Sequence, residues 1–254
     1  MIPKIIHYCW FGGNPLPELA EKCIASWKKY CPDYEIIQWN EENFDVNGMT
    51  YTRQAYEVKK WAFVSDVARF RALVEQGGVY MDTDVELLKP IDPLLELGGF
   101  TGFEATGQIA AGIMGCQKGE KVFREMLRRY EEDVFLLPDG SYNLETIVTK
   151  LMNVCMDSGF SAENKQQTID GFTVFPAEYF YPYDVSKEQT NITEKTYSIH
   201  YYDGSWLPQE DKDYLALRTR LMKHLPFQVA RYLAKFVNTM RYRGLRGVAQ
   251  ELRK

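Results

Sequence analysis

The chain has 254 residues, of which 45% are hydrophobic and 14% aromatic, and it carries a formal net charge of −5. This length is sufficient for one α/β domain with a well-buried core. The cysteines lie at scattered positions without metal-ligand spacing, which favours free thiols in a reducing compartment over a disulfide framework or a zinc site: Cys9, Cys23, Cys31, Cys116 and Cys155. The first residues contain no long apolar run, so the sequence predicts neither a signal peptide nor a membrane-spanning helix.

Strands and helices alternate in the first part of the chain. Lys4 to Trp10 is predicted to be a buried strand, Pro17 to Tyr30 a helix and Tyr34 to Trp39 a second strand. This strand-helix-strand opening is typical of a nucleotide-binding α/β half, although it lacks the G-x-G-x-x-G turn of dinucleotide folds. Residues 40–60 are polar and are predicted to be irregular.

The segment from Trp61 to Glu86 contains the strongest signals in the sequence and the first candidate site residues. Its apolar residues recur at helical spacing up to Gly77-Gly78, where glycine accepts the positive φ that ends many helices. Residues 79–81 then form a short predicted strand that delivers Asp82 and Asp84 to its carboxyl end. Ligands of open α/β sheets bind at that end of the strands.

Two carboxylates separated by one residue can bind one hard cation together. Proteins usually offer Mg²⁺ or Mn²⁺ one or two carboxylates, and substrate phosphates and water complete the coordination. The pair Asp82 and Asp84 is nevertheless a weak signal alone, because about one such pair is expected by chance among 14 aspartates. A solvated turn is the alternative. A second pair, Asp211 and Asp213, is interpreted as the acidic first turn of a helix.

Asp66 and Arg69 lie three residues apart on the preceding helix and can act together. They are either a surface ion pair or a carboxylate and guanidinium that face the same pocket as the aspartate pair. Spacing alone does not decide between these readings.

The combined pattern resembles a known family. Ser65-Asp66-x-x-Arg69, then Leu73, and Gly77-Gly78-x-Tyr80-x-Asp82-x-Asp84, is similar to the sugar-binding region of glycosyltransferase family 32. The resemblance implies a GT-A-type α/β domain, with a mixed central sheet flanked by helices. It also implies transfer of a hexose from a nucleoside-diphosphate sugar to a glycan or lipid-linked glycan, with retention at the anomeric carbon, as in surface polysaccharide (capsule) synthesis.

The resemblance also implies residue roles. Asp82 and Asp84 would hold Mn²⁺ or Mg²⁺, while Asp66 and Arg69 would bind the sugar or diphosphate. Further donor contacts would come from Trp10, which stacks on the base, and from Gly12 and Tyr80. Tyr80 is alternatively a core residue, and so is Trp10.

A closing motif of the same family is similar to the segment His200-x-x-x-x-Ser205-Trp206. A neutral imidazole is a suitable third manganese ligand, and Trp206 would then belong to a loop that excludes water from the donor. The alternative for His200 is a satisfied histidine at a strand end. Gln108 stands near the position where many relatives carry asparagine, and it is a weak candidate for a donor contact.

Further elements are expected after the aspartate pair. Strands are predicted at residues 100–104, 109–116, 172–175 and 197–201, and helices at residues 121–133 and 142–156. The predicted domain covers residues 1–214.

Residues 215–254 are predicted to form a basic amphipathic helical tail. From Arg218 onward the net charge is +9, whereas the remainder of the chain carries −14. Such a helix suits an anionic membrane surface, and a solvated helix packed on the domain is the alternative. The sequence therefore predicts a cytoplasmic protein peripheral on the inner face of the plasma membrane. It predicts no nucleic-acid partner.

Two rival functions remain open at this stage. Asp82 could be the nucleophile of a haloacid-dehalogenase-like phosphatase, because a strand followed by Asp82-Thr83-Asp84-Val85 superficially resembles the strand and Asp-x-Asp motif of that family. The chain could also be a non-catalytic sugar-binding module associated with a membrane.

Overall fold

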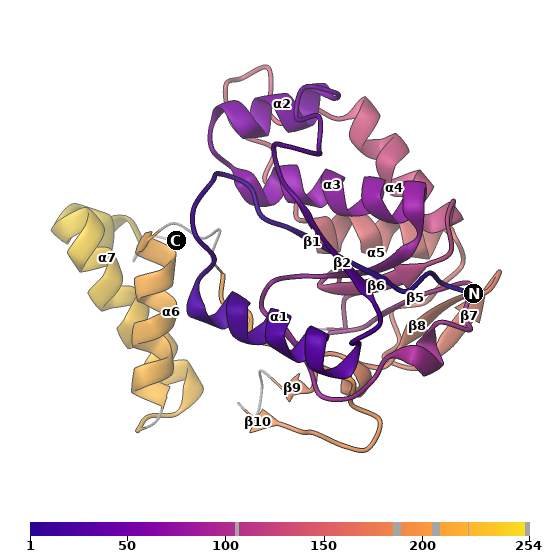
Figure 1. The fold of residues 1–254 in the computed structure, drawn as a ribbon. Coiled ribbons are helices and arrows are strands. Elements are labelled where there is room, and N and C mark those ends of the chain that lie inside the picture. Colours follow the sequence, from indigo (N-terminus) through magenta and orange to yellow (C-terminus); the bar gives the residue numbers. More distant parts are fainter. Residues whose placement is uncertain (105–106, 185–188, 205–208, 223, 252–254) are drawn as a thin grey trace. The chain divides into compact units, whose positions relative to one another are not determined.

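The computed structural model describes residues 1–104, 107–184, 189–204, 209–222 and 224–251 (Figure 1). The chain consists of two compact units, Met1–Tyr202 and Asp203–Lys254. The boundary expected between residues 214 and 215 falls inside a helix of the second unit.

Helices and strands alternate through the first unit. The helices are α1 (Glu18–Tyr30), α2 (Thr50–Glu57), α3 (Trp61–Gln76), α4 (Lys121–Glu132) and α5 (Ile147–Asp157), with 3₁₀ turns at Asp92–Leu94 and Ala177–Tyr179. The strands are β1 (Ile5–Cys9), β2 (Glu35–Trp39), β3 (Gly78–Met81), β4 (Val85–Leu87), β5 (Gly99–Gly102), β6 (Ile113–Cys116), β7 (Gln167–Ile169), β8 (Phe172–Phe175), β9 (Tyr183–Asp184), β10 (Gln189–Thr190) and β11 (Ser198–His200). The second unit contains α6 (Gln209–Met222) and α7 (Phe227–Glu251).

A seven-stranded mixed sheet with the order β2-β1-β3-β6-β5-β8-β7 forms the centre of the first unit. β2, β1 and β3 run parallel, so their carboxyl ends meet at one edge. β6 runs antiparallel to β3 and therefore begins at that same edge. The predicted α/β class, with a mixed central sheet flanked by helices, is confirmed.

The core has two parts, one on each face of the sheet. Figure 1 shows α1 on one side of the sheet and α3 and α4 on the other. Alternate side chains of β1 reach opposite parts, because successive strand residues point to opposite faces: Ile6 and Tyr8 pack with the α1 side, and Cys9 packs with the α3 side.

The predicted transition from helix to strand at Gly77-Gly78 is present. α3 ends at Gln76, and Gly77 and Gly78 have φ values of 72° and 103°. A Cβ on Gly78 would lie 2.7 Å from the carbonyl oxygen of Ile5. Glycine is needed here both for the positive φ and for the close approach of β1.

A separate two-stranded sheet joins β4, which follows Asp84, to β11 near the end of the first unit. The two strands pair antiparallel, and His200 lies opposite Val85. The helix α1 supports this pair, since the Trp27 indole N–H donates to the Val85 carbonyl at 2.7 Å and the Leu87 N–H donates to the Ser26 hydroxyl at 2.9 Å. Residues 115 positions apart are thereby fixed next to one another.

Several predicted boundaries were wrong. The region expected to be irregular contains α2, whose buried face consists of Tyr51, Thr52 and Ala55 and so lacks an apolar period. The helix expected from residue 142 begins only after Thr146, whose hydroxyl accepts a hydrogen bond from the Thr149 N–H and caps it. The strand expected from residue 109 begins at Ile113, because Ile109 forms only an isolated bridge with Phe103.

In the second unit, the segment predicted as a helical tail contains the end of α6 and all of α7, with Pro226 between them, and α7 is kinked at Gly244, whose φ is 62°. Asp213 accepts bonds from Arg241 at 2.6 Å and from Tyr242 at 2.9 Å. Asp211 lies in the acidic first turn of α6, as interpreted, whereas Asp213 joins α6 to α7. No helix among the described residues of either unit is long and apolar enough to cross a membrane.

Candidate active site

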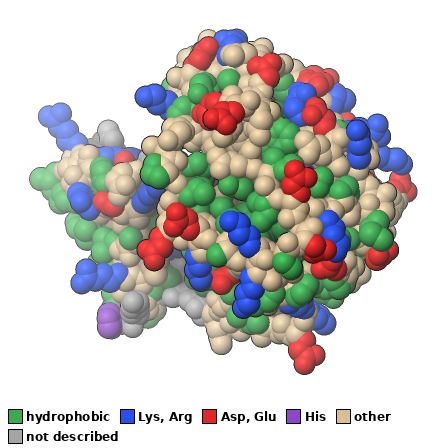
Figure 2. Space-filling view, in the orientation of Figure 1, with side chains coloured by type: hydrophobic (Ala, Val, Ile, Leu, Met, Phe, Trp, Pro, Cys, Tyr) green, Lys and Arg blue, Asp and Glu red, His purple; other side chains and the backbone are tan. Residues whose placement is uncertain are grey.

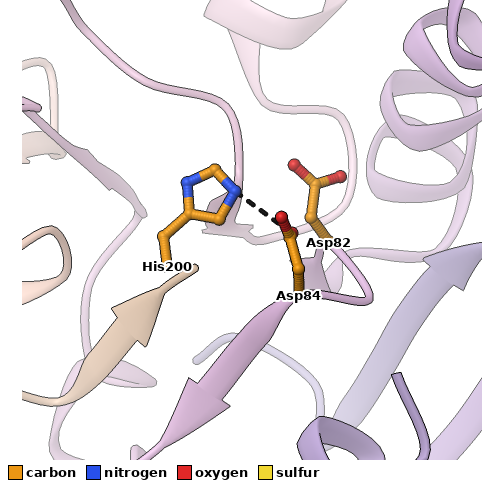
Figure 3. A group of neighbouring side chains, drawn as sticks. All are labelled: Asp82, Asp84 and His200. Carbon is orange, nitrogen blue, oxygen red and sulfur yellow. Dashed lines mark ion pairs between the residues drawn. The ribbon is translucent and has the colours of Figure 1, made fainter. Parts of the chain in front are cut away.

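Asp82, Asp84 and His200 converge at the carboxyl edge of the sheet (Figure 3). Each offers one ligand atom, and these atoms lie within 4.8 Å of one another. Asp82 and Asp84 follow β3, whereas His200 ends β11, which is paired with the strand after Asp84. His200 Nε2 lies 3.1 Å from Asp84 Oδ1. The structure therefore brings together the three side chains predicted to bind metal.

The donor set fits a divalent cation. Two carboxylates and one imidazole suit Mn²⁺, which accepts both oxygen and nitrogen ligands. The His200 Nδ1 atom is buried and has no hydrogen-bond partner among the described residues. Burial lowers the pKa of His200, but the hydrogen bond and charge of Asp84 outweigh it and raise the pKa overall. Without a cation, His200 Nε2 therefore donates to Asp84, and a bound cation would take the place of that proton.

Asp82 is fixed by two further side chains. The Tyr80 hydroxyl donates to Asp82 Oδ1 at 2.8 Å, and Arg69 Nη1 lies 3.2 Å from the same oxygen. Burial raises the pKa of Asp82, and the nearby Arg69 charge opposes that rise. Tyr80, which the resemblance assigned to the sugar donor, is a core residue, 1% exposed, and its hydroxyl is hydrogen-bonded to Asp82.

Asp66 and Arg69 are each 6% exposed, so the alternative of a surface ion pair is wrong. Arg69 Nη2 donates to Asp66 Oδ1 at 3.0 Å, while Nη1 also donates to the Ala111 carbonyl at 3.1 Å. The guanidinium carbon lies 4.6 Å from the centre of the Tyr80 ring. Burial raises the pKa of Asp66 to about 7, against the opposing charge of Arg69. Arg69 thus joins the helix aspartate to the strand aspartate.

The start of β6 supplies groups that the motif did not reveal. The Asp82 N–H donates to the Gly112 carbonyl at 2.8 Å. A Cβ on Gly112 would lie 3.3 Å from each of Asp82 Oδ2, His200 Cε1 and the Tyr181 hydroxyl. In the sequence, the small residues just before β6 were the feature that could have indicated a close approach of this segment to the site. Gln108 is exposed, and its carbonyl accepts the Glu104 N–H in a turn.

The remaining predicted donor residues lie near the end of β1 or outside the described residues. Trp10 packs with the α1 side of the core, and its indole N–H donates to the Asn14 carbonyl at 2.7 Å. Gly12 lines a cavity of about 500 Å³. Ser205 and Trp206 fall in residues 205–208, outside the described part of the chain.

Comparison with known proteins identifies a family region that contains Asp82 and Asp84. Residues 17–99 match the family model described as "Glycosyltransferase sugar-binding region containing DXD motif". Inositol phosphoceramide mannosyltransferase 3 of Schizosaccharomyces pombe is 29% identical over 146 residues, which cover 53% of this chain and 38% of that protein. Uncharacterized glycosyltransferase L373 of Acanthamoeba polyphaga mimivirus is 24% identical over 221 residues, which cover 82% of this chain and 85% of that protein.

Among solved structures, the glycosyltransferase GlyE of Streptococcus pneumoniae TIGR4 is similar with a TM-score of 0.49 and 13% identity, covering 91% of this chain and 63% of that chain. The chain spans only 33% to 38% of the length of three yeast relatives, two inositol phosphoceramide mannosyltransferases and one mannosyl phosphorylinositol ceramide synthase. The relatives of this chain are glycosyltransferases, as predicted. The resemblance to family 32 is thereby confirmed: residues 17–99, which include Asp66, Arg69, Asp82 and Asp84, match the family model of a glycosyltransferase sugar-binding region containing the DXD motif.

Proposed function

We propose that this chain is a metal-dependent, retaining glycosyltransferase that moves a hexose from a nucleoside-diphosphate sugar to a glycan or lipid-linked glycan. The observation that carries the proposal is the convergence of Asp82, Asp84 and His200 beside the buried Asp66–Arg69 pair. The family match of residues 17–99 supports the same reaction class. Surface polysaccharide synthesis is the setting we propose for it.

Asp82, Asp84 and His200 would hold Mn²⁺ or Mg²⁺, which when bound supplies positive charge to a departing diphosphate. The protein's own part is orientation. Arg69 and Tyr80 hold Asp82 Oδ1 from two directions, so this carboxylate needs little rearrangement on binding. Asp66 would hydrogen-bond donor hydroxyls and would oppose positive charge that develops on the sugar ring.

The rival functions have less support. A phosphatase with Asp82 as nucleophile needs a later acidic pair to complete its metal site, whereas the third side chain found beside Asp82 and Asp84 is His200. The family match also concerns a glycosyltransferase region rather than a phosphatase.

A turnover assay distinguishes the glycosyltransferase from the phosphatase and from the sugar-binding module. The purified chain is supplied with Mn²⁺ and a panel of nucleotide sugars, and released nucleoside diphosphate is measured with and without chelator. Metal-dependent release supports the proposal. Phosphate release from sugar phosphates would favour the phosphatase, and binding without turnover would favour a sugar-binding module.

We also propose that the second unit lies on an anionic membrane surface, on the inner face of the plasma membrane. Five large apolar residues of α7 are 42% to 64% exposed at positions that share one helical face: Val229, Tyr232, Leu233, Phe236 and Val237. Ala230 and Ala234, by contrast, are fully buried. Figure 2 shows hydrophobic and basic side chains together on the surface of this unit. An apolar face beside basic residues suits a lipid headgroup layer, and a lipid-linked acceptor would be reached from there.

Cosedimentation with vesicles that contain anionic lipid tests this placement. The variant Leu233→Glu with Phe236→Glu should lose vesicle binding, because two charges would enter the apolar face. Ala216→Glu with Thr219→Glu, at two exposed positions of α6, adds the same charge outside the apolar face and is the matched control. Equal binding by the double variant and the unaltered chain would show that this face of α7 does not contact the membrane.

A further inference from the structure

The carboxyl edge of the sheet continues past the metal-binding side chains, on the side away from β1. β6 separates β3 from β5 and runs antiparallel to both of them. β5 therefore ends at the same edge as β3, two strands away and about 10 Å from it. Glu104 follows the end of β5 by two residues. The sheet thus places beside the site a further carboxylate that the Asp-x-Asp motif does not include.

The backbone of Glu104 is fixed at the base of a turn. Its N–H donates to the Gln108 carbonyl at 2.9 Å, and its carbonyl accepts the Gly107 N–H at 2.9 Å. Phe103 and Ile109, on either side of this turn, form a bridge. The Glu104 side chain is half-buried. A carboxylate on a paired backbone is positioned before a ligand arrives, which limits the entropy lost on binding.

Tyr202 links Glu104 to the metal-binding histidine. Its hydroxyl donates to Glu104 Oε2 at 3.3 Å, and its ring lies against His200, with ring centroids 4.1 Å apart. This hydrogen bond is long, because a hydroxyl and a carboxylate oxygen usually lie about 2.5–2.7 Å apart. A ligand hydroxyl can therefore form a shorter bond to Glu104. Burial lowers the pKa of His200 and nearby carboxylates raise it, Glu104 among them, so Glu104 lies within electrostatic reach of the metal-binding side chains.

The Tyr202 ring is exposed beside this carboxylate. Its φ of 52° lies in the left-handed region, which tyrosine rarely adopts. Strain of this kind persists where the surrounding contacts impose it, and here it holds the ring between His200 and Glu104. An exposed aromatic ring next to a carboxylate suits a pyranose, whose C–H face packs on the ring and whose hydroxyls donate to the carboxylate.

Retention sets the side from which the acceptor arrives. The new bond replaces the broken one on the same face of the donor sugar, so the acceptor oxygen must come in beside the position proposed for the diphosphate. The donor contacts that the family resemblance implies, Trp10 and Gly12, lie past the end of β1, on the other side of β3. The β5 side of the edge, where Glu104 and Tyr202 lie, is therefore the side that suits the acceptor.

We propose that Glu104 and Tyr202 form the acceptor subsite and bind the terminal pyranose of the acceptor glycan; the inference rests on the proposed retaining transfer from a nucleoside-diphosphate sugar. Glu104 accepts hydrogen bonds from hydroxyls of this pyranose, and the Tyr202 ring packs against it. Neither the donor nor the cation needs the Glu104 carboxylate. Its loss accordingly weakens transfer to a glycan more than it weakens transfer to water, which is hydrolysis of the donor.

A comparison of transfer with hydrolysis tests this subsite. The nucleotide sugar that the chain cleaves fastest with Mn²⁺ is incubated alone and with the methyl glycosides of mannose, glucose and galactose, and glycosylated products are measured by mass spectrometry. The informative variant is Glu104→Gln, which keeps the shape of the side chain but replaces an acceptor oxygen with an amine. Glu86→Gln is the matched control, because Glu86 accepts the hydroxyl of the neighbouring Tyr201 and lies on β4, outside the proposed subsite.

We expect Glu104→Gln to lower kcat/KM for the methyl glycoside about 10- to 100-fold, mainly through KM, because a hydrogen bond to a charged group is lost. Hydrolysis of the donor and the affinity for Mn²⁺ should each change less than about threefold, since neither uses this carboxylate. Glu86→Gln should alter none of these quantities.

The other outcomes overturn the inference in distinguishable ways. Equal transfer by Glu104→Gln and the unaltered chain would show that Glu104 does not bind the acceptor. An equal loss of transfer and hydrolysis would mean that Glu104 supports the donor or His200 instead. Hydrolysis without transfer to any methyl glycoside would show that the subsite does not take a pyranose. Absence of Mn²⁺-dependent cleavage of every nucleotide sugar, with the fold verified by thermal melting, would overturn the proposed function together with this inference.

Discussion

Asp82 is the residue on which the separate parts of the site meet. One of its oxygens is bound by Arg69 and Tyr80, and the other faces the space beside Gly112 and His200. The sequence predicted Asp82, Asp84 and His200 from the resemblance to family 32, because the Asp-x-Asp spacing alone is a weak signal. It did not reveal Gly112, because that glycine reaches Asp82 only through the pairing of β6 with β3.

Gly112→Ala should weaken Mn²⁺ binding by about tenfold or more. The new methyl group would lie 3.3 Å from both Asp82 Oδ2 and His200 Cε1, in the space that a shared cation needs. Overpacking at such a contact costs about 1–3 kcal/mol of stability, so the chain should remain folded. Calorimetric Mn²⁺ titration measures the affinity and thermal melting reports the fold. Unchanged affinity would show that the cation does not use this space.

Asp66 should give the folding stability a distinctive pH dependence. Burial raises its pKa from 3.8 to about 7 in the folded chain. As pH rises from about 4 to about 7, the unfolded chain therefore loses this proton first, and the stability contributed by Asp66 falls. Asp66→Asn removes the titration, so the free energy of unfolding of the unaltered chain, relative to the variant, should decrease across that window. Urea unfolding at several pH values measures it. A relative increase with pH would mean that Arg69 keeps Asp66 ionised and its pKa low.

At the scale of elements, the clearest predictions came from strong local signals. α3, the Gly77-Gly78 transition and β3 were predicted because an apolar period, a glycine pair and a strand follow one another without interruption. α2 was missed because its buried face contains Tyr51 and Thr52. The pairing of β4 with β11 depends on contacts between distant segments, which no local pattern encodes.

The support that α1 gives to β4 through these hydrogen bonds can be tested directly. Trp27 is fully buried, and its indole donates to the Val85 carbonyl at the start of β4. Trp27→Phe removes this donor and leaves a small void, so it should lower the free energy of unfolding by about 2–3 kcal/mol. Ser26→Ala, which removes the acceptor of the Leu87 N–H, should cost about 1–2 kcal/mol. Chemical denaturation measures both. Stabilities equal to that of the unaltered chain would show that α1 does not support β4.

At the scale of the whole molecule, charge is unevenly distributed between the ends of the chain. Residues from Arg218 onward carry a net +9, while the preceding residues carry −14. Composition revealed this asymmetry and the sequence predicted an amphipathic tail, but neither revealed that this part of the chain contains two helices, α6 and α7.

Vesicle binding should therefore depend strongly on salt. Each basic residue near anionic headgroups contributes about 1 kcal/mol, and this attraction is screened within a Debye length. Cosedimentation with anionic vesicles should fall steeply between low and high salt, with little binding to neutral vesicles at any salt concentration. Equal binding to neutral and anionic vesicles would contradict a role for the basic residues.

The central claim is that Asp82, Asp84 and His200 hold one divalent cation at a nucleoside-diphosphate site. Electron paramagnetic resonance titration of Mn²⁺ in the presence of GDP and, separately, of UDP tests it most directly, since bound Mn²⁺ loses the spectrum of the free ion. The account predicts one tightly bound ion per chain, and loss of that ion in a folded Asp84→Asn variant. Retention of the same tightly bound ion by that variant would contradict it.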